Sequence, residues 1–190
     1  MKLTVSTSKQ AYHHGDLRRA LVEAGLTLLQ SREADDLSLR EVARTVGVSA
    51  TAVYRHFPNK TALLDALAGE GLRLLADAQH RAAEAAGGGE AGFLAIGVAY
   101  VRFALNHPAL FRLTFSATSV RTLLENPPEH LPDALAFLRA NAEAAAAHTG
   151  EDPKVIALHA WSVAHGLAVL LLEGQITLED GLIERVIGLR

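Results

Sequence analysis

The sequence contains no cysteine, and only 5% of its 190 residues are aromatic, with a single tryptophan. A chain without cysteine forms neither a disulfide scaffold nor a thiolate metal site. Alanine and leucine are abundant and β-branched residues are scattered singly, a bias that favours helices over sheet. The length is that of one domain, or of a small domain joined to a larger one. We therefore expect an all-α protein with a sizeable core.

The N-terminus lacks the basic start and apolar stretch of a secretory signal, because residues 1–14 are largely polar. We therefore expect a cytoplasmic protein. The 18 residues from Val155 to Leu172 include no Asp, Glu, Lys or Arg, and a membrane-spanning helix needs roughly 17 to 25 residues. Polar His159, Ser162 and His165 recur within this run at every third position. We interpret it as a buried helix of a soluble protein and expect no membrane association.

The net charge is only −3, but the charges are unevenly divided. Residues 1–60 carry nine Lys and Arg against six Asp and Glu, whereas the other 130 residues carry nine against fifteen. A polyanion meets a local surface rather than the average charge of the chain. A nucleic-acid partner is therefore expected at the N-terminal third, where the net charge is positive.

Two helices are predicted at the start of the chain. The spacing of apolar residues predicts a first helix over about residues 16–31, with Asp16 as its cap. A second, short helix begins after Ser38, because Ser38 and Glu41 have the spacing of a capping box, and it ends at Gly47.

A third helix follows at once, with Ser49 as its N-cap and Pro58 just beyond its end. Val53 and Phe57 lie four residues apart and are expected to face the core. The two short helices and the tight turn between them predict a helix-turn-helix over about residues 38–57.

Longer helices are predicted for the rest of the chain. Asn59 is expected to cap a fourth helix that ends before the glycines at 87–89, which we interpret as a linker. Further apolar, alanine-rich helices are expected at about 91–106, 108–117, 132–148, 153–172 and from Thr177 onward.

The outer side of the third helix carries the candidate DNA contacts. In a helix-turn-helix the second helix enters the major groove by its N-terminal end. Thr51, Tyr54 and Arg55 fall on the outer side and carry groups that reach phosphates or base edges, and His56 and Lys60 flank them as donors. Two core helices that only pack together have the same pattern, but the local positive charge favours DNA.

Four segments in order resemble the DNA-binding domain of the TetR family of transcriptional repressors, over roughly residues 12–68. They are Tyr12-His13-His14-Gly15-Asp16-Leu17-Arg18, Leu39-Arg40-Glu41-Val42-Ala43, Gly47-Val48-Ser49 and Tyr54-Arg55-His56-Phe57-Pro58-Asn59-Lys60-Thr61-Ala62-Leu63-Leu64. The resemblance implies a homodimer that binds palindromic operator DNA, with a C-terminal helical domain that takes a small-molecule effector.

The resemblance also implies roles for single positions. Those similar to phosphate-contacting or base-contacting positions are Tyr54, His56 and Lys60. Those similar to operator-reading positions are Arg40, Ala50 and Thr51, with Ser49 and Ala52 beside them. The leading segment from Lys2 to Lys9 is expected to be a flexible tail, with a minor-groove arm as the alternative.

Trp161 followed by His165-Gly166 is similar to the Trp…His-Gly pattern of one C-terminal subset of this family. An effector cavity needs apolar walls and a few polar anchors. The candidates are Phe103, His107, Phe111, Phe115, Trp161 and His165. Ordinary core packing is an equally good explanation for each of them taken singly.

We divide the chain into a helix-turn-helix DNA-binding domain at 1–60 and a C-terminal helical domain for effector binding and dimerisation at 61–190. The last two predicted helices, Val155 to Leu172 and Thr177 to Leu189, are expected to form a four-helix dimer seam. Such a seam explains an apolar run too long for the core of a small monomer.

An enzyme is not expected. The glycines at 87–92 match G-x-G-x-x-G, but they follow a predicted helix instead of a strand and so lack the scaffold of a phosphate cradle. His107 or His165 as a general base has no nucleophile or carboxylate at a readable spacing. No H-E-x-x-H motif is present, and we expect no metal and no cofactor.

These observations predict a sequence-specific DNA-binding transcriptional regulator, a repressor released from its operator by a small-molecule effector. The alternative is a helical binding or carrier protein for small molecules that does not bind DNA. The two hypotheses differ in one measurable property, because binding to DNA phosphates weakens steeply with salt.

Overall fold

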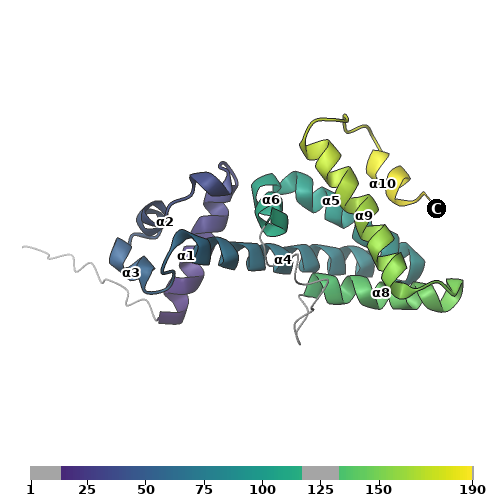
Figure 1. Ribbon diagram of the computed structural model, residues 1–190, viewed down its shortest axis with the longest axis horizontal. Helices are drawn as coiled ribbons and strands as arrows, with labels where there is room; N and C mark the ends of the chain where they lie inside the picture. Colours follow the sequence, from purple (N-terminus) through teal and green to yellow (C-terminus); the bar gives the residue numbers. More distant parts are fainter. Residues whose placement is uncertain (1–13, 117–132, 190) are drawn as a thin grey trace, which may run out of the picture.

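The computed structural model describes residues 14–116 and 133–189, and every regular element in these two ranges is a helix, as expected (Figure 1). The elements are α1 (His14–Leu29), η1 (Ala34–Asp36), α2 (Leu39–Val46), α3 (Ala50–Tyr54), α4 (Lys60–Ala85), α5 (Gly89–Asn106), α6 (Pro108–Ser116), α8 (Asp133–Thr149), α9 (Pro153–Leu172) and α10 (Leu182–Ile187).

The predicted helix caps of α2 and α3 in the N-terminal unit, which comprises α1, η1, α2 and α3, are confirmed. The Ser38 hydroxyl accepts a hydrogen bond from the Glu41 amide at 3.2 Å, and Gly47 ends α2 in the left-handed conformation with φ of 78°. The Ser49 hydroxyl accepts from the Ala52 amide, also at 3.2 Å. Each cap satisfies backbone groups that a helix end leaves free. The turn between α2 and α3 is therefore set by local hydrogen bonds.

The core of this unit contains the residues that were expected to face inward. Val53 and Phe57 are fully buried, together with Leu21 of α1 and Val42 of α2. Burial of the apolar stripes of three short helices holds the helix-turn-helix together, because helices of this length are marginal by themselves.

Several predicted boundaries are wrong. α1 begins at His14, before the expected cap Asp16. The final helix starts at Leu182 and not at Thr177, and it has only 6 residues. The glycines at 87–89 are no linker: all three have positive φ, and they form the tight turn that joins α4 directly to α5. Glycine carries no β-carbon and adopts these dihedrals without strain.

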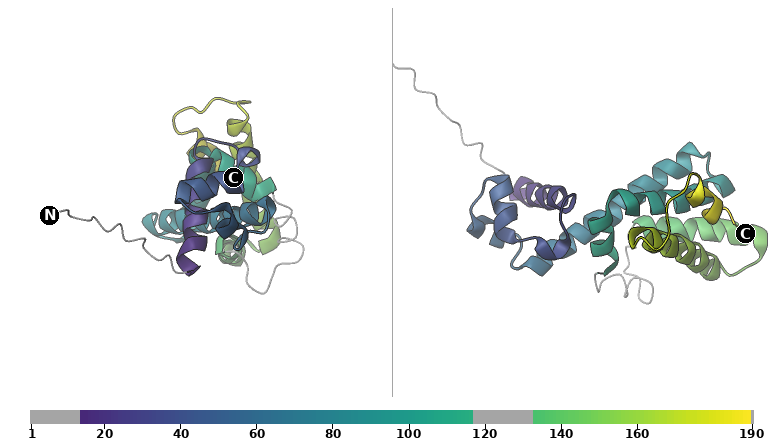
Figure 2. Two further views of the ribbon diagram at one scale, coloured as in Figure 1. Left: turned by 90° about the vertical axis from the view of Figure 1, so that its left-hand side faces the viewer. Right: turned by 90° about the horizontal axis from the view of Figure 1, so that it is seen from above.

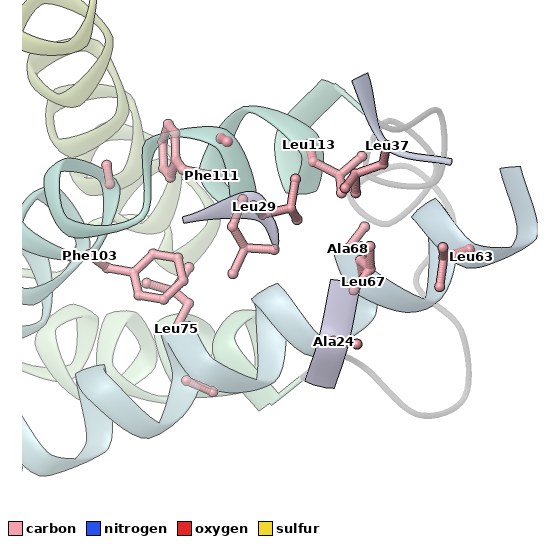
Figure 3. Close-up of a cluster of buried hydrophobic side chains, with 14 of the residues drawn as sticks. Ala24, Leu29, Leu37, Leu63, Leu67, Ala68, Leu75, Phe103, Phe111 and Leu113 are labelled. Atoms are coloured by element: carbon pink, nitrogen blue, oxygen red, sulfur yellow. The ribbon is translucent and has the colours of Figure 1, made fainter. Parts of the chain in front are cut away.

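α4 is the long axis of the molecule. It runs for 26 residues without a break, from the helix-turn-helix at one end of an elongated protein to the larger helical bundle at the other (Figures 1 and 2). Near its start it buries Leu63 and Leu67 beside α1, and further on it buries Leu75 beside α5 and α6. One apolar core is therefore shared by both ends of the chain (Figure 3).

Two glycines allow the neighbouring helices to approach α4 closely. A β-carbon at Gly25 of α1 would lie 2.9 Å from Leu67 Cδ2. A β-carbon at Gly71 of α4 would lie 2.2 Å from Thr114 Oγ1 of α6. Both distances are shorter than a van der Waals contact, so a β-carbon at either position requires the side chain of Leu67 or Thr114, or the helix that carries it, to shift.

α9 differs from the buried helix that the sequence suggested. By length and composition it could cross a membrane, as could α5 and α6 taken together, but those two are bent by 110°. Only Ala164, Leu167 and Ala168 of α9 are buried. One side of α9 packs on α5 and α8, whereas the other leaves large apolar residues exposed within the described part of the chain.

Candidate DNA interface and effector cavity

The outer face of α3 carries three exposed polar side chains. Thr51, Tyr54 and Arg55 are exposed, and Tyr54 retains 48% of its accessible surface although it is a large aromatic residue. Ala50 and Ala52 lie half-buried between them. The Ser49 hydroxyl is occupied as the helix cap, so it has less capacity left for a DNA phosphate.

Free cationic groups lie on both helices of the helix-turn-helix. Arg40 at the start of α2 and Arg55 after α3 are exposed and form no ion pair with any described residue. By contrast, Arg32 and Arg44 both lie within ion-pair distance of Glu41. Unpaired guanidinium groups on an exposed surface are suited to bind phosphates or guanine edges.

Lys60 and His56 are less exposed than the predicted contacts on α3. Both are half-buried. Lys60 is the first residue of α4, and its ammonium group donates a hydrogen bond to the backbone carbonyl of Asp35 in η1. Lys60 therefore ties η1 to the start of α4. This contact joins residues 25 positions apart, so no local pattern indicates it.

One more cation of this unit was not singled out from the sequence. The guanidinium carbon of Arg18 on α1 lies 5.2 Å from the ring centroid of Phe57, which is within the range of a cation–π contact. Arg18 is exposed and covers the buried ring of Phe57. Arg18 ends the segment from Tyr12 to Arg18, which resembles the TetR family. That resemblance is the sequence signal that could have identified Arg18.

A cavity of about 750 Å³ lies among the helices of the C-terminal bundle. Its walls come from α4, α5, α8 and α9, with Phe115 of α6 and Ile187 of α10 completing them. Most of the lining is apolar, and it includes Leu72, Leu75, Phe93, Leu94, Ile96, Tyr100, Phe115, Leu138, Ile156, Trp161 and Val163. A cavity of this size and character holds a drug-sized organic molecule.

Tyr100 is the centre of a polar network at the cavity wall. Its hydroxyl accepts a hydrogen bond from Trp161 Nε1 at 3.1 Å and lies 2.8 Å from His165 Nδ1. Trp161 can only donate to this hydroxyl, and the tautomer of His165 sets whether the Tyr100 hydroxyl or Nδ1 donates in the second hydrogen bond. Burial raises the pKa of Tyr100, and burial also lowers the pKa of His165. Both groups are therefore neutral at physiological pH.

The structure brings together four of the six predicted effector residues. Phe115 and Trp161 line the cavity. Phe111 and His165 lie behind that wall, with ring centroids 5.5 and 6.2 Å from the Tyr100 centroid. A role in effector binding stays a prediction for all four.

Phe103 and His107 lie elsewhere. Their rings contact each other with centroids 4.9 Å apart, and both residues line a separate, shallower hollow beside Arg102 and Glu184. Phe103 is buried and His107 is exposed. Neither residue lines the large cavity.

Several polar lining residues were missed by sequence reasoning: the buried or half-buried Gln79, Tyr100 and Asn141, and the exposed Glu90, His148, Thr149, Glu151 and His159. Gln79 is only 4% exposed, and its Oε1 has no hydrogen-bond partner. Gln79 occupies the apolar face of α4, four residues after Leu75 and four before Ala83. A polar residue at a core position of an amphipathic helix is the signal that could have found it.

A metal site is not apparent in the described ranges. Within residues 14–116 and 133–189, no three His, Asp or Glu side chains are grouped so that they could hold an ion.

Two protein families match this chain. Residues 21–67 match the family described as bacterial regulatory proteins, tetR family. Residues 93–187 match the tetracyclin repressor-like C-terminal domain. The first match covers the helix-turn-helix and the start of α4, and the second covers most of the bundle that encloses the cavity.

Two relatives match only part of this chain. The chain is 48% identical over 48 residues to the tetracycline repressor protein class A from transposon 1721 of Escherichia coli, which is 25% of this chain and 22% of that protein. It is 32% identical over 128 residues, 63% of this chain and 61% of the relative, to an uncharacterized HTH-type transcriptional regulator of Haemophilus influenzae. The chain thus matches about a fifth of the tetracycline repressor's length.

Solved structures match nearly the whole chain. A protein with unknown function from Rhodococcus sp. RHA1 has a TM-score of 0.74 and 34% identity, covering 94% of this chain and 93% of that one. A tetR-family transcriptional regulator from Streptomyces coelicolor has a TM-score of 0.65 and 20% identity, covering 91% and 78%. The second likeness is one of fold alone.

Proposed function

Because this chain belongs to the TetR family of bacterial regulatory proteins, we propose that it represses transcription from a specific operator and leaves that operator when a small molecule fills its cavity. TetR-family regulators are DNA-binding transcriptional repressors with ligand-binding C-terminal domains, and they act as dimers. The observation that carries the proposal is the exposed polar face of α3, flanked by unpaired Arg40 and Arg55.

DNA recognition rests on α3 and the residues around it. α3 has only 5 residues, so its N-terminal end and the side chains of Thr51 and Tyr54 enter the major groove together. Arg40 and Arg55 bind phosphates or guanine edges on either side. Two copies in a dimer reach successive major grooves, which are about 34–36 Å apart.

Effector release acts through α4 and α6. The same α4 helix lines the cavity with Leu72, Leu75 and Gln79 and begins at Lys60 beside the helix-turn-helix. On α6, Arg112 pairs with Glu33 of the N-terminal unit at 3.0 Å and lies 3.7 Å from Glu173 after α9. The dimer has one conformation whose two α3 helices fit successive major grooves and a second in which α4 and α6 are shifted. A ligand that binds the second conformation more tightly favours it, and the distance between the α3 helices then no longer fits the operator.

The dimer forms through α9 and the segment that follows it. Val155, Leu158, Val169 and Leu170 are exposed, and their spacing places them on one face of α9. Ile176, Leu178 and Leu189 in the C-terminal segment are also exposed. A second copy that covers these apolar residues removes them from water. The contribution of α10 itself is small, because this helix is short and buries Ile183 within its own chain.

The proposed regulator is a cytoplasmic protein that catalyses no reaction and needs no cofactor or metal. The N-terminal unit at 1–60 binds DNA, and the bundle at 61–190 binds the effector and the partner. α4 starts at this boundary, so its first turns also pack against α1.

Binding of the purified chain to duplex DNA from upstream of its own gene tests the proposal. We expect a gel shift that survives random competitor DNA and weakens steeply across a salt series, because phosphate contacts release counterions. The same competition is then repeated with DNA fragments selected from the whole genome. If random competitor DNA abolishes binding to all of them, the result favours the helical carrier protein instead.

A further inference from the structure

Gln79 is an unpaired polar group at the wall of the cavity. It is 4% exposed, it lines the cavity, and its Oε1 has no hydrogen-bond partner. Buried amide oxygens are nearly always hydrogen-bonded, because an oxygen that leaves water without gaining a new partner destabilises the folded protein. Oε1 itself is buried although the residue lines the cavity, and the terminal torsion of a glutamine is broad, so rotation about this torsion is the motion that would turn the oxygen toward a ligand.

Each of the other buried or half-buried polar side chains of the described lining forms a hydrogen bond. The Tyr100 hydroxyl is engaged by Trp161 and His165. Asn141 Nδ2 donates to the carbonyl of Phe137 at 2.8 Å. Gln79 is therefore the polar lining side chain best placed to distinguish one ligand from another.

The charges around the cavity do not suit an anionic ligand. No Lys or Arg belongs to the described lining, and its two histidines, His148 and His159, are exposed. The acidic members, Glu90 and Glu151, are exposed as well, and the pKa of His165 behind the wall is lowered by burial. An anion beside Gln79 would therefore leave water without gaining a buried cationic partner, which is unfavourable.

We propose that the cavity binds an uncharged, largely apolar aromatic molecule whose hydroxyl or N–H group donates a hydrogen bond to Gln79 Oε1. Aromatic rings of Phe93, Tyr100, Phe115 and Trp161 form the apolar wall against which such a molecule packs. This assignment rests on the proposed function, because it names the chemical class of the effector.

Three related fluorescent probes test the assignment: hydroxypyrene, which is neutral and donates; methoxypyrene, which is neutral and does not donate; and pyrene carboxylate, which is anionic. Trp161 is the single tryptophan of the chain and lines the cavity, so energy transfer from Trp161 to pyrene reports binding. In the full-length protein without DNA, we expect hydroxypyrene to bind most tightly and pyrene carboxylate to bind about tenfold or more weakly than hydroxypyrene.

Substitution of the amide separates its role from general packing. Gln79→Leu should weaken hydroxypyrene binding about fivefold to tenfold, as expected for one lost hydrogen bond, and should change methoxypyrene binding less than about twofold. Gln175→Leu is the matched control, because Gln175 is exposed in the segment after α9 and does not line the cavity; it should change neither probe. The thermal midpoint of Gln79→Leu should not fall, since an unpaired amide is removed. If this variant does not fold, Gln79→Met makes the same test.

The assignment is wrong if Gln79→Leu leaves hydroxypyrene affinity unchanged, if the carboxylate binds as tightly as hydroxypyrene, or if none of the probes binds. The proposed function is judged separately, by the gel shift without ligand. A chain that shifts its operator but binds no probe overturns only the ligand class. A chain that binds hydroxypyrene through Gln79 but no operator overturns only the repressor, and the cavity assignment stands.

Discussion

At the scale of single residues, the predicted DNA contacts of the N-terminal unit fall into two kinds: side chains that are free to bind DNA and side chains that also hold the fold together. Tyr54 and Arg55 touch little of the folded chain, whereas Lys60 donates a hydrogen bond to Asp35. Truncation of the first two should therefore affect binding alone. Truncation of Lys60 should also loosen η1 from α4, so the two effects are mixed at that position.

Tyr54→Ala should weaken operator binding by about 1–3 kcal/mol, the usual cost of a lost base or phosphate contact. The thermal midpoint should hardly change, because Tyr54 is 48% exposed. Gel shifts and thermal unfolding on the same preparation measure both effects, with Thr27→Ala on the outer face of α1 as a surface control. Unchanged operator affinity in Tyr54→Ala would remove this residue from the interface.

The His165 imidazole should make stability depend on pH. Burial lowers the pKa of His165 in the folded chain, so below the unfolded pKa of about 6.5 the unfolded chain binds more protons. The free energy of unfolding should therefore fall as the pH drops below about 6.5. Urea unfolding across a pH series should show a smaller fall in His165→Gln than in His159→Gln, because His159 is exposed. Equal falls in both variants would show that His165 does not cause the dependence.

At the scale of helices, the close crossing of α4 and α6 is set by one glycine. Gly71 faces Thr114, and the Thr114 hydroxyl donates to the Leu110 carbonyl inside α6 at 2.8 Å, so this contact has little freedom to move. Gly69, two residues earlier in the same helix, has nothing within 4 Å of the position that a β-carbon would take.

Gly71→Ala should therefore destabilise the protein by about 1–3 kcal/mol through overpacking. Gly69→Ala should stabilise it by about 0.5–1 kcal/mol, because alanine favours the helix. Chemical denaturation of the two variants measures the difference. A stabilised Gly71→Ala variant would mean that α6 moves away from α4 at little cost, and its effector response would then be worth comparing with that of the wild type.

At the scale of the whole molecule, the exposed apolar residues of α9 belong to the helical bundle, whereas α3 lies in the unit at the opposite end of α4 (Figures 1 and 2). Dimerisation and DNA contact therefore use separate surfaces. The two surfaces are connected within the chain by α4 and by Arg112, which pairs with Glu33 of the N-terminal unit and lies 3.7 Å from Glu173 after α9.

Leu158→Glu should convert the dimer to a monomer, because it places a charge in an apolar seam. Leu158 is 52% exposed in the single chain, so the substitution should not unfold the protomer. Light scattering after size-exclusion chromatography measures the mass, and operator affinity should fall with the loss of the second half-site contact. Gln30→Glu adds the same charge at an exposed position outside the seam and should remain a dimer. A dimeric Leu158→Glu protein would place the seam elsewhere.

Features that depend on neighbours along the chain could be predicted from the amino-acid sequence. The all-α class, the caps at Ser38, Ser49 and Asn59, and the buried faces of Val53 and Phe57 follow from hydrogen bonds and apolar spacing over three or four residues. The family resemblance of residues 12–68 also lies in this local pattern. Helix ends were less well predicted, because the last turns depend on packing and not on propensity.

Contacts between residues on different helices could not be predicted in this way, because they depend on how the helices pack in three dimensions. Phe103 and His107 line a separate hollow, although Tyr100 of α5 lines the cavity together with Phe115 of α6. Tyr100, Gln79 and Asn141 come from three helices, and no local pattern brings them to one wall. The exposed face of α9 could not be predicted for the same reason. An apolar helix is buried only where another helix packs against it, and the sequence of α9 does not show where that is.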